Sequence, residues 1–436
     1  MKSSAFSRSL ELAKLAAKVG LKEVRSGNLS SRLDQAVIIA ESLSKLKGAA
    51  MKAGQLLSLE LTDYFPKEAI EILSKLQNSA HAVDFAIVEK TLRTELGPEF
   101  KNLQNLSRTP LGIASIGQVH RATYQGQEIV LKVQYPGVAE SIDSDIKILK
   151  TLAVAFCGLT GREMDLDPLF TEFRHLLGQE VDYLKEAEFQ KEYKERVQSL
   201  SFARGVRCAV PEVISELTTE RVLAMSYESG LTLRQCIQQP LSSSKKEMMA
   251  HTFLDLYFSE FFHWALVQTD SNLANFLVRD SQTQNPELVL LDFGASRRYS
   301  AEFIRNYIRL LRVVAEGDFS DLKKHAIDFG LIDPRESHEA FVAFEDMLKT
   351  AIKPFFSANG SRADFDFSDQ SHALNSQRVG RQLSERLKFS PPPHELVFLH
   401  RKLGGVYTVL KNLGVTLDVS PYWKMMIEAE DLWKAK

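Results

Sequence analysis

The feature that most constrains the fold is a pair of polar motifs in the second half of the chain. Asp270 and Asn275 stand five residues apart in the sequence TDSNLANFLV. A short apolar run at 288–291 then leads Asp292 into a D-F-G turn, 22 residues after Asp270. Phosphoryl transfer from a nucleotide needs Mg²⁺ held by carboxylate and amide oxygens, and the acceptor hydroxyl needs a positioned base. A fold that brings these two loops together supplies all of these groups.

A different pattern near residue 108 supplies the complementary parts. Two β-rich stretches, 118–123 and 128–134, flank a connection at 124–127 and predict a β-hairpin. A loop of small residues at 112–117 precedes the hairpin, and Lys132 lies in its second strand. Small residues let backbone N–H groups approach a phosphate, and a lysine adds a point charge. Each part alone is weak evidence for nucleotide binding, because many edge strands carry a lysine and many strands end in a D-F-G turn. The ordered set predicts kinase-like nucleotide binding.

Length and charge narrow the class of protein. With 436 residues, the chain is expected to form two or three structural units. Its formal net charge of -2 argues against a nucleic-acid partner. The three cysteines, Cys157, Cys208 and Cys236, are far apart and lack a C-x-x-C motif. They therefore predict neither a disulfide framework nor a zinc site, and they favour a reducing compartment.

The amino-terminal region predicts helices. Residues 1–25 have helical apolar spacing, with six basic and two acidic residues, a net charge of +4. This helix either docks on its own protein, the favoured interpretation, or contacts an anionic membrane surface. Residues 34–61 predict a long helix or a helix pair with a cluster of small residues, beside which Lys52 and Gln55 point the same way. By themselves, these two residues are best read as a solvated edge.

Two further expectations concern membranes and the apolar second half. The longest apolar stretch, near 152–159, is shorter than the ~20 residues of a membrane span, and no signal peptide is expected. We therefore expect a cytoplasmic protein without a transmembrane segment; a peripheral position at the inner membrane is implied by the family resemblance described below. Residues 251–268 predict one buried helix, in which His263 is a core histidine rather than a proton carrier.

Several motifs in order carry a family resemblance. The chain resembles the UbiB/AarF (ADCK-type) atypical kinases over roughly residues 35 to 415. Its QTD catalytic loop is similar to the mitochondrial quinone-synthesis branch. The motifs are KAGQ at 52–55, PLGIASIGQVHRA at 110–122, VLKVQYPGV at 130–138, EVDYLKEA at 180–187, QTDSNLANF at 268–276, LLDFGASR at 290–297 and FLHRKLGGVYTVLK at 398–411.

The resemblance implies ATP and Mg²⁺ as cofactors and assigns roles by position. Lys132 matches the strand lysine and Asp270 the catalytic-loop aspartate, while Asn275 and Asp292 match the metal ligands. The family's Ala-rich nucleotide loop and the linker that meets the adenine correspond to Ala114, Ser115, Ile116 and Gly117, and to Met225, Ser226, Tyr227 and Glu228.

The acidic motif implies further roles. Glu186 is our choice for the glutamate that pairs with Lys132, although Glu180 stays an alternative. The 54 residues between Lys132 and Glu186 predict an insertion that carries helices. Glu180 and Asp182 match the family's regulatory ExD element, and Lys52 with Gln55 match its KxGQ element. On one continuous helix, Asp182 and Glu186 would share a face, with Glu180 about 120° away.

Three positions depart from the family pattern. The Ala-rich loop begins here with Gly112-Ile113, which could change nucleotide preference. Phe189 replaces a usual asparagine and removes a polar group. Ser271-Asn272-Leu273 lacks the usual proline. Neither the lysine nor a metal ligand is lost.

The expected fold class is α+β: a kinase-like bilobal fold with a small antiparallel-sheet lobe and a largely helical C-lobe. We expect a helical extension with the KxGQ element at 1–104, the small lobe with its helical insertion at 105–229, and the helical lobe at 230–436.

Three functions compete. The resemblance favours a Mg-ATP-dependent ATPase or small-molecule kinase that supports ubiquinone synthesis at a membrane surface, with anionic lipid, quinone-precursor phenols or quinone-biosynthesis proteins as partners. A protein Ser/Thr kinase is the second, but the KxGQ helix would occupy the peptide's place, and no A-P-E segment follows Asp292. A pseudokinase scaffold is the third. The intact set of Lys132, Asp270, Asn275 and Asp292 argues against a scaffold.

Overall fold

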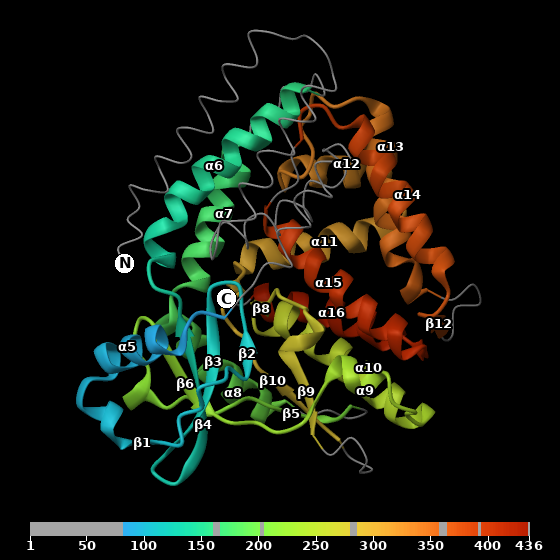
Figure 1. Ribbon diagram of the computed structural model, residues 1–436. Helices are drawn as coiled ribbons and strands as arrows, with labels where there is room; N and C mark the ends of the chain where they lie inside the picture. The colour runs from blue at the N-terminus through green and yellow to red at the C-terminus, as the bar shows by residue number, and fades with distance from the viewer. Residues whose placement is uncertain are drawn as a thin grey trace. The chain divides into compact units, whose positions relative to one another are not determined.

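The computed structural model describes residues 82–159, 166–200, 205–279, 286–356, 364–390 and 394–434 (Figure 1). The chain divides into two compact units. Unit 1 contains the chain up to Ala187 together with Glu212–Tyr227, and unit 2 contains Glu188–Pro211 and Glu228–Lys436. The predicted amino-terminal helices, with Lys52 and Gln55, lie outside the described residues.

An antiparallel sheet forms the centre of unit 1. Its strand order is β1-β3-β4-β6, and β2 pairs with the opposite end of β3 from β1. The strands are β1 (Leu103–Gln104), β2 (Gly112–Ile113), β3 (Gly117–Tyr124), β4 (Gln127–Gln134) and β6 (Val222–Ser226).

The predicted hairpin is confirmed, with slightly longer strands and a shorter turn. Only Gln125 and Gly126 connect β3 to β4, and both have positive φ, 50° and 81°. This backbone matches the right-handed twist of the strands, as two-residue hairpin turns do. The predicted loop at 112–117 is partly wrong, because Gly112–Ile113 pairs with Val119 and Gln118 as strand β2.

Helix α5 (Phe85–Leu96) covers the apolar face of this sheet. Its buried residues Val88, Leu92 and Leu96 recur every four positions, the spacing of one helix face. They join Ile129 and Leu131 of β4 in one apolar core. The Asp84 side chain accepts a hydrogen bond from the Ala86 N–H and caps the start of the helix. Short 3₁₀ turns lie at η2 (Gly97–Asn102) and η3 (Ser215–Leu217).

The predicted helical insertion is confirmed. Helices α6 (Val138–Leu159) and α7 (Asp167–Glu180) follow β4 and lie side by side (Figure 1), and α8 (Tyr183–Ser199) comes next. The prediction of one helix through residues 180–187 is wrong. Helix α7 ends at Glu180, and the Asp182 carboxylate accepts a hydrogen bond from the Lys185 N–H at 3.0 Å. An aspartate that caps a new helix interrupts the old one, so the 120° relation does not apply.

The described residues of unit 2 form three small sheets. The largest has the order β5-β10-β9-β7, with β5 and β10 parallel, and the others are the pairs β8–β11 and β12–β13. The strands are β5 (Arg207–Ala209), β7 (Leu231–Thr232), β8 (Leu266–Gln268), β9 (Phe276–Arg279), β10 (Glu287–Leu290), β11 (Ser296–Arg298), β12 (Asp364–Asp366) and β13 (Thr416–Asp418).

Helices make up most of the rest of unit 2, as the sequence predicted. They are α9 (Leu233–Ile237), α10 (Ser243–Phe258), α11 (Ala301–Glu316), α12 (Phe319–Asp328), α13 (His338–Ile352), α14 (Gln370–Arg386), α15 (His394–Leu413) and α16 (Ser420–Lys434), with the short helical turns η4 (Ser259–His263), η5 (Leu273–Asn275) and η6 (Lys353–Phe355). Among the described helices, none combines the length and apolar character that a bilayer crossing requires.

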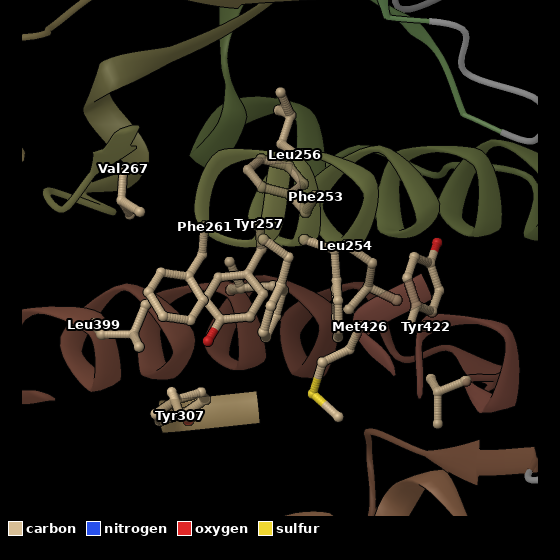
Figure 2. Close-up of a cluster of buried hydrophobic side chains, with 14 of the residues drawn as sticks. Phe253, Leu254, Leu256, Tyr257, Phe261, Val267, Tyr307, Leu399, Tyr422 and Met426 are labelled. Atoms are coloured by element: carbon tan, nitrogen blue, oxygen red, sulfur yellow. The ribbon is translucent and has the colours of Figure 1, made fainter. Parts of the chain in front are cut away.

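The core of unit 2 forms around α10. Figure 2 shows Leu254, Tyr257 and Phe261 on the side that faces Leu399 of α15 and Met426 of α16. Aromatic rings such as Phe258, Phe262 and Tyr307 contribute to this cluster and bury large areas per residue.

The prediction of one helix over 251–268 is wrong in its second half. Helix α10 ends at Phe258, a π-helical turn continues to His263, and Ala265 reverses the chain with a φ of 52°. The next residues, Leu266–Gln268, form strand β8 by pairing with β11. Periodicity alone does not separate a short buried strand from a buried helix, and the distant partner strand decides. The His263 ring is half-buried, and burial lowers its pKa.

Candidate active site

In unit 1, strand β4 presents Lys132 to the first turn of α8. The Lys132 Nζ lies 2.8 Å from Oε1 and 2.9 Å from Oε2 of Glu186. The pair is enclosed, with the Glu186 side chain 1% and the Lys132 side chain 12% exposed. The Tyr183 ring lies 5.2 Å from the ammonium. The structure therefore pairs Lys132 with Glu186, the glutamate that the sequence analysis chose.

The segment before Glu186 fixes where helix α8 starts. The Asp182 carbonyl accepts the Glu186 N–H at 3.0 Å, in addition to the side-chain cap described above. The Gln134 side chain, at the end of β4, donates to the Val181 carbonyl at 2.8 Å. The strand that carries the lysine is thus tied to the junction that precedes the glutamate. Glu180, on α7, belongs to a different helix from Glu186.

The small-residue loop closes as a tight turn. The Ala114 N–H donates to the Gly117 carbonyl at 2.8 Å, so Ser115 and Ile116 lie between the two bonded residues. Ile116 is buried in unit 1, and Ile113 is 47% exposed. Gly117 is required sterically, because a Cβ there would lie 2.5 Å from the Val133 carbonyl oxygen.

The predicted adenine linker divides between a strand and a loop. Met225 and Ser226 belong to β6, and the Ser226 N–H donates to the Glu212 carbonyl. The Tyr227 N–H donates to the Glu128 carbonyl at 3.0 Å. In unit 2, the Glu228 carboxylate pairs with Arg279 at 2.7 Å.

In unit 2, the catalytic-loop motif folds into a short turn. The Asn275 Nδ2 donates to Asp270 Oδ2 at 3.1 Å and to the Asp270 carbonyl at 3.3 Å. The Asn272 side chain accepts the Ala274 N–H and starts the turn η5, where the family pattern has a proline nearby. The loop therefore orients Asn275 through its own side-chain hydrogen bonds.

Asp292 lies beside this turn. The Leu291 N–H donates to the Asn275 carbonyl at 3.0 Å, next to the β9–β10 ladder. The Asp292 Oδ1 accepts the Gly294 N–H at 3.0 Å. Unit 2 thus brings together Asp270, Asn275 and Asp292, the three oxygen-bearing side chains that the sequence singled out.

The donor set suits Mg²⁺. The Asp292 carboxylate and the Asn275 amide oxygen are hard oxygen ligands, and Mg²⁺ in phosphoryl-transfer sites takes one or two carboxylates plus phosphate oxygens. Across the described part of the chain, no cluster of three or more His, Cys, Asp or Glu side chains could hold a metal. Mg²⁺ bound by few protein groups generally completes its coordination with phosphate oxygens and water.

Sequence reasoning missed a group of residues behind these loops. Arg401 Nη2 lies 3.5 Å from Asp270 Oδ1, and Lys402 Nζ lies 2.9 Å from Glu260 Oε2. Gln268 donates to the backbone of the catalytic loop. The signal was present in the motifs QTD and FLHRKLGG, but nothing local indicates which distant side chains they meet. Phe189, the other departure from the family pattern, lies in the apolar core of unit 2.

The antiparallel sheet with a lysine–glutamate pair, and the loops bearing D-x-x-x-x-N and D-F-G, define a kinase-like protein of the α+β class. Residues 75–326 match the ABC1 atypical kinase-like domain. The chain belongs to this family of atypical kinases, and the resemblance found in the sequence is confirmed.

Three relatives of this chain are named as kinases. The chain is 32% identical over 421 residues to Atypical kinase COQ8, mitochondrial, of Saccharomyces cerevisiae, covering 94% of this chain and 80% of the relative. It is 32% identical to Probable serine/threonine-protein kinase abkA of Dictyostelium discoideum, covering 87% and 68%. It is 31% identical to Atypical kinase coq-8, mitochondrial, of Caenorhabditis elegans, covering 87% of this chain but about half, 49%, of that relative.

A solved structure supports the fold. The Rv3197–erythromycin complex from Mycobacterium tuberculosis has a TM-score of 0.60 and 21% sequence identity, covering 97% of this chain and 98% of that chain. At this identity the likeness concerns the fold alone.

Proposed function

We propose that this protein binds Mg-ATP and transfers the γ-phosphoryl group to a small molecule or to water. The observation that carries the proposal is the buried Lys132–Glu186 pair, with both carboxylate oxygens within 2.9 Å of the ammonium. A buried ion pair is weak evidence for stability, but it holds a lysine ammonium in one fixed place. Kinases use such a pair to fix a lysine against nucleotide phosphates.

Each of these side chains has a separate role in the proposed reaction. Lys132 holds phosphate oxygens, and Glu186 keeps the ammonium in place. Asn275 and Asp292 would hold Mg²⁺, which would neutralise the charge that develops on the phosphates. Asp270 accepts the proton of the attacking hydroxyl while the bond from the γ-phosphorus to the bridging oxygen breaks, and ADP leaves.

The nucleotide loop and the regulatory residues keep the roles that the family suggests. Ala114 and Ser115, in the small-residue turn, contact the phosphates, and the backbone of Met225 to Glu228 meets the adenine. Glu180 and Asp182 act with Lys52 and Gln55 as regulatory elements.

We further propose that the reaction supports isoprenoid quinone synthesis at an inner-membrane surface. The COQ8 names of the relatives support this assignment. The net charge of +4 over residues 1–25 suits a peripheral contact with anionic lipid. Quinone-precursor phenols or quinone-biosynthesis proteins are the expected partners.

The test compares the wild-type protein with Asp292→Asn. ATP turnover should rise with anionic vesicles or precursor phenols in the wild type and be lost in the variant. Cells that carry only the variant should accumulate quinone precursors. Phosphate incorporation into added proteins would instead support a protein kinase, the activity in the name of the Dictyostelium relative. Nucleotide binding without turnover under every lipid condition would support a scaffold.

A further inference from the structure

Three buried polar side chains lie behind the aspartates of unit 2. They are Gln268 of β8, Glu260 of the π-helical turn and Lys402 of α15, exposed by 5%, 2% and 4%. The proposed chemistry gives none of them a task. Buried polar groups need partners, so their contacts show what the cluster holds.

The Gln268 side chain bridges the two candidate catalytic segments. Its Nε2 donates to the Asp270 carbonyl at 2.8 Å and to the Asp292 carbonyl at 3.1 Å. An amide nitrogen carries two N–H groups, so one side chain serves both acceptors. The residues that it joins carry the proposed base and a proposed metal ligand.

A buried ion pair fixes which way this amide points. Gln268 Oε1 lies 3.4 Å from Lys402 Nζ. A lysine ammonium only donates, so the amide oxygen must face Lys402 and the nitrogen must face the two carbonyls. Glu260 Oε2 lies 2.9 Å from the same ammonium and compensates its charge. With the amide reversed, three acceptor oxygens would face one another.

Other hydrogen bonds join these two segments at residues other than Asp292. Strands β8 and β11 pair, and the Thr269 N–H and hydroxyl both donate to the Ala295 carbonyl, at 3.2 and 2.7 Å. Ala295 lies three residues beyond Asp292, so these bonds align the strands. The Gln268 amide instead reaches the backbone of Asp292 itself.

We propose that Gln268 is a positioning residue that sets the spacing of Asp270 and Asp292, and that the Lys402–Glu260 pair orients its amide. The inference rests on the proposed function, because the importance of this spacing depends on a shared Mg-ATP. Residues that orient metal ligands typically change metal affinity about 10- to 100-fold when replaced. A shift of about 1 Å in reacting groups can lower turnover about 100-fold.

The experiment compares three single variants. Gln268→Leu removes the bridge, and Gln268→Glu keeps an acceptor for Lys402 but has no N–H to donate. Gln190→Leu is the matched control, because Gln190 is also buried in unit 2 and its amide donates to the Pro211 carbonyl at 2.9 Å. Hydrogen–deuterium exchange of peptides spanning 270–276 and 292–297 is measured with Mg²⁺-dependent ATP turnover.

Both Gln268 variants should exchange faster in both peptides, with turnover about 100-fold lower and an Mg²⁺ midpoint at least about tenfold higher. The control should change neither peptide nor the Mg²⁺ midpoint. Unchanged exchange in a folded Gln268→Leu protein, or the same effects in the control, would overturn the proposal. If the wild type hydrolyses no ATP, the proposed function fails, and the exchange data alone decide whether Gln268 positions the two segments.

A double variant tests the orienting pair separately. Lys402→Met with Glu260→Gln removes both charges together and leaves no buried ion without its partner. Faster exchange in both peptides is expected, because the amide then has no fixed direction. Exchange like that of the wild type would overturn the role given to the ion pair.

Discussion

Two adjacent glycines in α15 offer a matched test of how tightly this helix packs on the catalytic loop. A Cβ added to Gly405 would lie 2.0 Å from the Ser271 Cβ and 2.5 Å from its Oγ. A Cβ added to Gly404 would meet nothing within 4 Å. Gly405→Ala is therefore the perturbation, and Gly404→Ala is its control.

The expected magnitude follows from these distances. Carbon atoms in contact lie about 3.5–4.0 Å apart, so the helix or the loop must move by roughly 1.5–2 Å. Replacing a helical glycine by alanine gains up to about 1 kcal/mol at either site, and overpacking costs about 1–3 kcal/mol at Gly405 alone. We therefore expect Gly405→Ala to be about 1–3 kcal/mol less stable than Gly404→Ala. Ser271 directly follows Asp270, so ATP turnover should also fall, by about 100-fold for a 1 Å shift.

Thermal unfolding and ATP turnover of the two variants check this reasoning, with Ser271→Gly in the Gly405→Ala background as a rescue. Removing the Ser271 side chain makes room for the new methyl group and should restore most of the turnover. Equal stability and equal turnover in the two alanine variants would refute the close contact. Failure of the rescue would show that the damage arises elsewhere.

Three further predictions concern unit 1. Lys132→Met should weaken ATP affinity about 10- to 100-fold, since one charge-assisted contact contributes about 1.5–3 kcal/mol. Adding Glu186→Gln should cause no further loss of affinity in calorimetric titration. A double variant whose affinity falls by the product of the two single losses would contradict the pairing. Ala114→Gly should alter the ratio of ATP to ADP affinity, and an unchanged ratio would show that the turn does not contact the phosphates. Burial lowers the pKa of His120 below its ordinary 6.5, opposed by the hydrogen bond to the Ser107 carbonyl. The folded state therefore binds fewer protons, and its stability should fall as the pH drops below about 6.5. In His120→Leu, the thermal midpoint should depend less on pH over this range. An unchanged pH dependence would show that other groups cause it.

The parts of the fold that the sequence predicted correctly depend on local signals. Alternating apolar residues on both sides of a connection that contains Gly126 mark the hairpin, and the long interval after Lys132 marks the helical insertion. The choice of Glu186 rested on the family motif, and the position of Glu186 in the first turn of α8 agrees with it. These features depend on neighbours within a few residues or on a known motif, so one sequence contains them.

The errors share a different physical cause. Residues 266–268 were predicted as helix because their apolar pattern fits both structures, and the choice depends on pairing with 296–298. The break at Asp182 depends on a side chain that caps a helix and is equally able to lie within one. The contact between Gln268 and Lys402 spans 134 residues, and no local pattern specifies it. Tertiary partners decide such features.

The most direct test of the central claim measures ATP binding and ATP turnover in the same preparation of Asp270→Asn. The side chain keeps its size but loses the carboxylate that accepts the proton, whereas Lys132, Asn275 and Asp292 are unchanged. Mg-ATP affinity close to that of the wild type, with turnover reduced to background, is the result that we predict. Normal turnover would contradict the assignment of Asp270 as the base. Loss of binding and turnover together would contradict the claim that other residues bind the nucleotide.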